Sequence, residues 1–143
     1  IDTICKKPTT TELTTWTAHR SIANEACMLL LGLAQVESEI RIWPHHFDTG
    51  VYFEAKNHLG IGFGLAMQDE MAKDSYFYLS ANPEDYKIQY TNLPNEYFWR
   101  WEISDDWTGA ILPLKELEGK YYEEKIYLLS GFIKTIYNWM IKQ

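Results

Sequence analysis

The chain has 143 residues, of which 46% are hydrophobic and 23% are charged, so it is long enough to bury its own core and is not expected to be disordered. Asp and Glu number 20 against 13 Lys and Arg, and the formal charge of -7 comes without any basic run. An acidic protein of this kind repels phosphate backbones and anionic lipids, so we expect neither a nucleic-acid partner nor a membrane partner.

The two cysteines are too few for a disulfide framework. Cys27 lies inside an apolar stretch, residues 26–34, where a buried free thiol is the usual state, and this stretch is too short to span a bilayer. We therefore expect a reducing compartment and a cytoplasmic localisation. Because the chain begins with Ile1 rather than Met, a further expectation is that the single α+β domain predicted for residues 1–143 is the C-terminal portion of a longer chain.

Hydrophobic periodicity predicts two long helices, the first over residues 11–35 and the last from residue 114 or 119 to the terminus. Alternation of apolar and polar side chains between them predicts strands over residues 39–43, 50–55, 59–67, 75–81, 97–103 and 109–112. Short connections favour antiparallel pairing. We therefore predict an α+β fold, with a mainly antiparallel twisted sheet of five or six strands flanked by the N-terminal and the C-terminal helix.

The segment Trp43-Pro44-His45-His46-Phe47-Asp48 holds the most distinctive polar residues of the chain. His46 and Asp48 are two residues apart and can share one face of a strand. An H-x-D pair is also the first half of a two-histidine, one-carboxylate iron site, which here needs His58 from a predicted turn over residues 56–58. The metal candidates are therefore His46, Asp48 and His58. We favour the alternative, in which Asp48 caps a turn at Thr49-Gly50 and accepts a hydrogen bond from a histidine.

A histidine oriented by a carboxylate can also act as a general acid or base near neutral pH. His45 or His46 could pair with Asp48, or with Asp69 or Glu70 from the loop after the third strand. His46 and Asp48 are thus the catalytic candidates. No G-x-S-x-G motif accompanies them, so whether the protein is an enzyme, and which cofactor it would use, stays open.

The strand over residues 59–67 places Gly60, Gly62 and Gly64 on one face and apolar side chains on the other. A strip without side chains allows a ligand to approach the backbone, but glycines packed beneath cross-strand aromatic rings are commoner. We favour packing. These glycines lie within a strand and no helix start follows them, unlike a phosphate-binding loop.

Aromatic residues make up 15% of the chain, and several follow the fourth strand. Arg100 and Glu102 share a strand face and could form an ion pair. Alternatively, Arg100 anchors a ligand in an aromatic wall, because small-molecule sites combine apolar walls with a few polar groups. An ordinary aromatic core with charges at its rim is the favoured interpretation. The candidate binding residues are His45, His46, Asp48, Asp69, Tyr78, Arg100, Trp101 and Trp107.

The segment from Trp43 to Asp48 resembles a bacterial family of unknown function that carries a W-P-x-H-F-D motif in the C-terminal part of a longer protein. The likeness covers about residues 37–117 and includes GIGFG, QDE, YFYLSANP and WTGAILPLKEL, at residues 60–64, 68–70, 76–83 and 107–117. The family has S-P-G-D where this chain has Ala66 to Asp69, so only the aspartate of that loop matches. The resemblance implies no activity.

The leading functional hypothesis is a small-molecule-binding domain with a His/Asp cluster beside an aromatic wall. A second hypothesis is a non-enzymatic interaction domain that forms a homodimer or packs on a missing N-terminal region through exposed aromatic residues. A third is a metal-dependent enzyme that uses the H-x-D motif.

Overall fold

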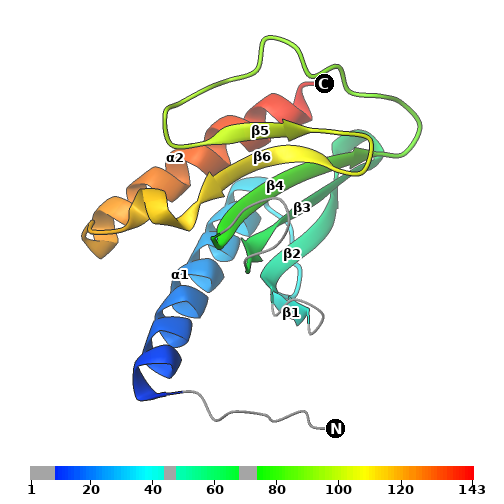
Figure 1. Ribbon diagram of the computed structural model, residues 1–143. Coiled ribbons are helices and arrows are strands. Elements are labelled where there is room, and N and C mark those ends of the chain that lie inside the picture. The colour runs from blue at the N-terminus through cyan, green and yellow to red at the C-terminus, as the bar shows by residue number, and fades with distance from the viewer. Residues whose placement is uncertain (1–8, 44–47, 68–73) are drawn as a thin grey trace, which may run out of the picture.

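The computed structural model describes residues 9–43, 48–67 and 74–143 of the chain (Figure 1). The predicted α+β class is confirmed, because two long helices flank an antiparallel sheet. The elements in chain order are α1 (Thr10–Ala34), β1 (Arg41–Trp43), β2 (Asp48–Ala55), η1 (Lys56–His58), β3 (Leu59–Ala66), β4 (Tyr76–Pro83), β5 (Arg100–Ile103), β6 (Thr108–Pro113), η2 (Leu114–Leu117) and α2 (Tyr122–Ile141).

The six strands are ordered β1-β2-β3-β4-β6-β5, and every neighbouring pair is antiparallel. Because β6 lies between them, β4 and β5 run in the same direction. The chain must therefore return along the length of the sheet between Pro83 and Arg100. Figure 1 shows this connection as a long loop that passes beside the C-terminal end of α2.

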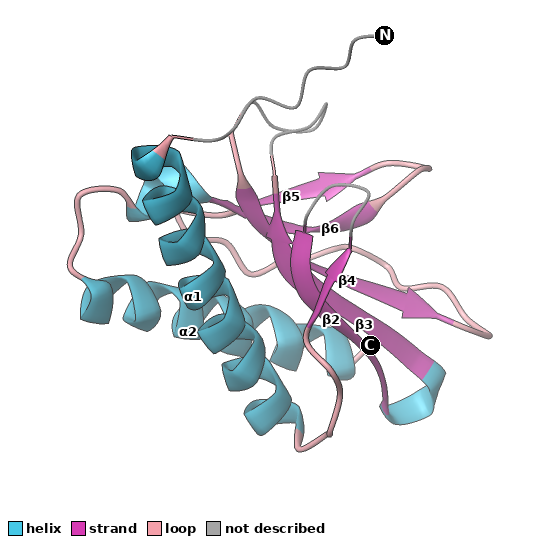
Figure 2. Ribbon diagram, turned by 90° about the horizontal axis from the view of Figure 1, so that it is seen from below, coloured by secondary structure: helices cyan, strands magenta, loops and turns pink. Residues whose placement is uncertain are grey.

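Both helices pack on one face of the sheet, with α1 against β2 and β3 and α2 against β4 (Figure 2). Strand alternation directs the apolar side chains toward the helices. One row of this core runs across five strands through cross-strand partners, namely Val51, Phe63, Leu79, Ala110 and Trp101. We call the opposite side of the sheet the helix-free face.

The connection between β4 and β5 is fixed to the core by aromatic side chains. The indole N–H groups of Trp99 and Trp101 both donate to the carbonyl oxygen of Pro94, at 3.1 and 3.0 Å. The ring of Tyr90 lies 5.9 Å from that of Trp101 and 5.6 Å from that of Trp139, between centroids. These contacts hold a segment without helix or strand against both the sheet and α2.

Two element boundaries differ from the sequence prediction by three residues or more, each for a local reason. The strand predicted from Tyr97 begins only at Arg100, because the N–H of Trp99 bonds the carbonyl of Glu96 in a turn. The last helix begins at Tyr122 rather than at residue 114 or 119. Gly119 has φ 77°, a left-handed conformation that separates the short η2 from α2.

The glycines of β3 lie beneath aromatic side chains on the helix-free face, as the favoured interpretation predicted. A Cβ atom on Gly60 would collide with the hydroxyl of Tyr52, and one on Gly62 would lie 3.5 Å from the same ring. The hydroxyl of Tyr78 lies over Gly64 in the same way. The glycine strip therefore accommodates rings of neighbouring strands.

Among the described residues, neither helix is both long and apolar enough to cross a lipid bilayer.

Candidate functional site

The structure describes only part of the predicted site. His45, His46 and Asp69 lie outside the described residues. The structure describes the other candidate binding residues, which are Asp48, Tyr78, Arg100, Trp101 and Trp107. The described members divide between the two faces of the sheet, so they do not form one cluster.

Asp48 is the first residue of β2 and lies opposite Trp43 of β1. Its carboxylate accepts a hydrogen bond from the backbone N–H of Met67 at 3.3 Å. The predicted turn at Thr49-Gly50 is wrong, because both residues belong to the continuous strand Asp48–Ala55. Asp48 instead supplies an acceptor just beyond the end of β3, where the ladder with β2 stops.

Tyr78 of β4 lies on the helix-free face, between its cross-strand partners Gly64 and Ile111. Its ring contacts Trp107 edge to face, with centroids 6.3 Å apart and planes at 80°. Burial raises the pKa of the Tyr78 hydroxyl well above its usual value, and the negative charge of Asp48 raises the same pKa further. At neutral pH the hydroxyl is therefore a neutral hydrogen-bond donor.

This raised pKa predicts a loss of stability in alkali. An unfolded tyrosine ionises near pH about 10, whereas folded Tyr78 keeps its proton to higher pH. The contribution of Tyr78 to the free energy of unfolding is therefore complete below pH about 10 and is lost as the pH rises above it. Between pH 9 and 11 we expect the free energy of unfolding to fall less steeply in Tyr78→Phe than in the wild type. The two slopes should differ by at most about 1.4 kcal/mol per pH unit. Urea unfolding at several pH values measures the slope.

Asp48→Asn provides the electrostatic control, because it removes the charge that raises the pKa of Tyr78 but keeps an acceptor for Met67. We expect its alkaline slope to stay closer to that of the wild type than to that of Tyr78→Phe, because burial contributes more to the raised pKa of Tyr78 than the charge of Asp48 does. Burial also raises the pKa of Cys27, to about 12, and the pKa values of Tyr90 and Tyr137. Part of the slope should therefore persist in every variant, and identical slopes in wild type and Tyr78→Phe would contradict the assignment.

Arg100 and Glu102 form the ion pair that their shared strand face predicted. Nη1 of Arg100 lies 2.8 Å from Oε1 of Glu102, and both side chains are partly exposed. Ile111 is the cross-strand partner of both Arg100 and Tyr78 and separates them in the sheet. Arg100 thus lies on the same face as Tyr78, two strands away.

Trp101 lies on the other face, toward the helices. Its cross-strand partner is the buried Ala110, its ring centroid is 5.3 Å from that of Trp139, and its N–H bonds Pro94. The structure therefore does not bring Trp101 to Asp48 and Tyr78. These contacts match the favoured interpretation of an ordinary aromatic core.

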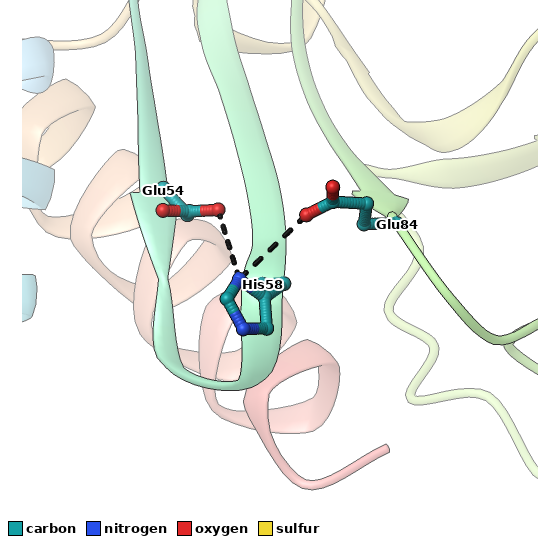
Figure 3. Close-up of side chains that lie close together, drawn as sticks. All are labelled: Glu54, His58 and Glu84. Atoms are coloured by element: carbon teal, nitrogen blue, oxygen red, sulfur yellow. Dashed lines mark ion pairs between the residues drawn. The ribbon is translucent and has the colours of Figure 1, made fainter.

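His58 does not join Asp48 either. It lies in η1, beyond the far end of the eight-residue strand that Asp48 begins, and a rise of about 3.3 Å per residue places the two about 20 Å or more apart. Asp48 and His58 therefore do not share one metal site, and the third candidate, His46, lies outside the described residues. The neighbours of His58 are Glu54 and Glu84, whose carboxylate oxygens lie 3.5 and 3.6 Å from its Nδ1 (Figure 3).

Trp107 also borders an open hollow of about 670 Å³ at the end of the sheet where β4 leaves it. Three chain segments meet there: the end of β4, the start of the β4–β5 connection and the turn before β6. Its lining combines aromatic, charged and small polar side chains, including Asn82, Tyr86, Lys87, Tyr90, Asp105 and Asp106. Sequence reasoning missed Tyr86 and Tyr90, for which the aromatic content of the loop was the only indication.

The turn before β6 is held rigidly by hydrogen bonds around Ser104. The Ser104 hydroxyl donates to the carbonyl of Trp107 at 2.9 Å and accepts from its N–H at 3.1 Å. The hydroxyl of Thr108 donates to the carbonyl of Ser104 at 3.1 Å. Asp105 and Asp106 are thereby fixed at an exposed tip on the rim of the hollow.

Two side chains of the types that serve in nucleophilic catalysis, Cys27 and His19, have pKa values shifted by burial. Burial raises the pKa of Cys27, so its thiol stays protonated and inert. Burial also lowers the pKa of His19, helped by the positive charge of Lys125, and this histidine lies with apolar side chains between α1, η2 and α2. Comparison of the chain with protein families, curated proteins and solved structures finds no match.

Proposed function

We propose that the protein binds a small molecule in the hollow between the end of β4 and the turn before β6. The observation that carries this proposal is the convergence of Tyr86 and Tyr90, from the β4–β5 connection, with Trp107, from the turn before β6, around one volume of about 670 Å³. Sites for small molecules have volumes of about 300–1,000 Å³ and combine aromatic walls with a few polar groups.

The charges on the rim define the class of ligand. Asp105 and Asp106 supply two carboxylates, and Lys87 supplies one cation. A ligand with a flat ring and an amine or amidine group could place its cation against the carboxylates. Its ring could lie on the aromatic side chains, where a cation is also attracted to the electron-rich face. The overall charge of -7 favours the approach of such a ligand.

Tyr78 supports this site from behind Trp107. Its edge-to-face contact restrains the indole, and Asp48 favours the neutral hydroxyl. Asp48 and Tyr78, two of the candidate binding residues, would then position the aromatic wall. Membership of the family that carries W-P-x-H-F-D is a separate proposal, which the motif supports.

Affinity measurements on matched ligands test the proposal. A set of small aromatic amines is compared by calorimetry with the corresponding neutral alcohols and carboxylic acids. We expect the amines to bind best, and Asp106→Lys to weaken their binding by about tenfold or more, since it replaces an attraction by a repulsion. Asp74→Asn alters an exposed carboxylate away from the hollow and should leave the affinity unchanged.

Trp107→Ala tests the aromatic wall, with circular dichroism to verify the fold. Loss of affinity for the amines in this variant would support stacking on the indole. Equal affinity for amines and acids, or amine binding that is unchanged in both Trp107→Ala and Asp106→Lys, would contradict the proposal.

A further inference from the structure

A second cluster of polar side chains lies at the turn between β2 and β3, outside the hollow. Glu54 comes from β2, His58 from the turn η1 and Glu84 from the residue after β4. The carboxylates flank the imidazole and both face its Nδ1 atom (Figure 3). One ligand atom of each residue lies within 4.8 Å of the other two.

The spacing of these atoms matches metal ligands better than hydrogen-bond partners. Nδ1 lies 3.5 Å from a carboxylate oxygen of Glu54 and 3.6 Å from one of Glu84, whereas an N–H···O hydrogen bond spans about 2.7–3.2 Å. Zn²⁺ binds nitrogen and oxygen ligands at about 2.0–2.2 Å in a tetrahedron. Two ligands of such an ion are therefore about 3.3–3.6 Å apart.

The backbone fixes the three residues relative to one another. The N–H of Glu84 donates to the carbonyl of His58 at 3.2 Å, which ties the end of β4 to the turn. Leu59 and Pro83 are cross-strand partners, so the residues that flank them, His58 and Glu84, must be neighbours. The donor atoms thus come from three segments that the sheet itself aligns.

We propose that Glu54, His58 and Glu84 bind a divalent transition-metal ion, Zn²⁺ in the first instance. Two carboxylates and one neutral imidazole offset the charge of a divalent cation, and imidazole favours zinc, copper or nickel over magnesium and calcium. Binding uses Nδ1 of His58. All three side chains are exposed, so solvent supplies the remaining ligand.

Zinc titration followed through the histidine ring nitrogens tests the site. We expect ZnCl₂ to shift the Nδ1 resonance of His58, with binding measured in parallel by calorimetry. His58→Gln and Glu84→Gln should each weaken zinc binding by about tenfold or more, since the loss of a residue that only supports a metal ligand already costs about that much. Glu39→Gln removes an exposed carboxylate that is paired with Arg41 and should leave zinc binding unchanged.

Three outcomes would overturn the proposal. The first is a His58 Nδ1 resonance that does not shift at a zinc concentration of about 1 mM, at which even weak sites are occupied. The second is zinc binding that survives His58→Gln but is lost in Asp48→Asn, which would place the metal at the other end of β2. The third is equal competition by Mg²⁺, which would indicate unspecific attraction to carboxylates. Amine binding in the hollow is measured separately, without metal, so the two proposals can fail independently.

Discussion

Replacing Phe63 with Ala is expected to lower the free energy of unfolding by about 3–5 kcal/mol, the usual cost of removing a buried phenyl ring. Phe63 is fully buried at the middle of β3. Its ring lies 6.0 Å from that of Phe77, with the planes at 17°. The substitution removes a contact in the central row of the core and leaves a cavity between the sheet and the helices.

Urea unfolding of purified variants measures this loss. Tyr97→Ala removes an aromatic ring that is 80% exposed, and we expect a change within about 0.5 kcal/mol. Phe63→Leu leaves a smaller cavity and gives an intermediate value if the alanine variant does not fold. Similar losses for Phe63→Ala and Tyr97→Ala would contradict the position of the core.

The second large effect is expected at Gly64, where alanine should cost about 1–3 kcal/mol or more, because the site cannot accept another carbon atom. A Cβ atom there would lie 2.6 Å from the carbonyl oxygen of Thr49 and 2.9 Å from Cα of Gly50. Both atoms belong to the backbone of β2, so the two strands must separate locally to admit it.

Gly60→Ala is the matched control, since it makes the same change on the same face of the same strand, four residues away. Its Cβ atom would meet the Tyr52 side chain, which is 56% exposed and can rotate away. We expect the loss at Gly60 to be clearly smaller than that at Gly64 in chemical denaturation. Equal losses, or a larger loss at Gly60, would show that backbone contact does not decide the cost.

The local features of the sheet could be predicted because side-chain alternation is a local property. The pattern of β3 placed its glycines on one face and predicted cross-strand aromatic rings over them, and the structure shows that Tyr52 supplies one of these rings. The same alternation separated Arg100 from Trp101. Grouping both in one aromatic wall was therefore inconsistent with the strand that the sequence itself predicted.

The features that sequence reasoning missed depend on register and strand order. The pairing of β4 with β6 sends residues 84–99 back along the sheet, and the hollow forms where this connection meets the turn before β6. Glu84 reaches His58 only because Leu59 pairs with Pro83. Such contacts join residues distant in the chain, and no local pattern encodes them.

Asp48 shows a different difficulty. Thr49-Gly50 is compatible both with a turn and with an extended strand, and its local sequence favours the turn. In the structure, Thr49 and Gly50 pair with both β1 and β3 and are therefore held in an extended strand. Tertiary context here overrides local propensity. The carboxylate therefore serves the end of β3 instead of a turn.

The most direct test of ligand binding in the hollow is a ¹H–¹⁵N NMR titration with an aromatic amine. Among the six tryptophans of the chain, we expect the indole signal of Trp107 to shift most. The affected amide signals should belong to residues 86–88, 90 and 104–108, which line the hollow. Shifts confined to the region around Asp48, or no shift with any amine, would contradict the proposed function.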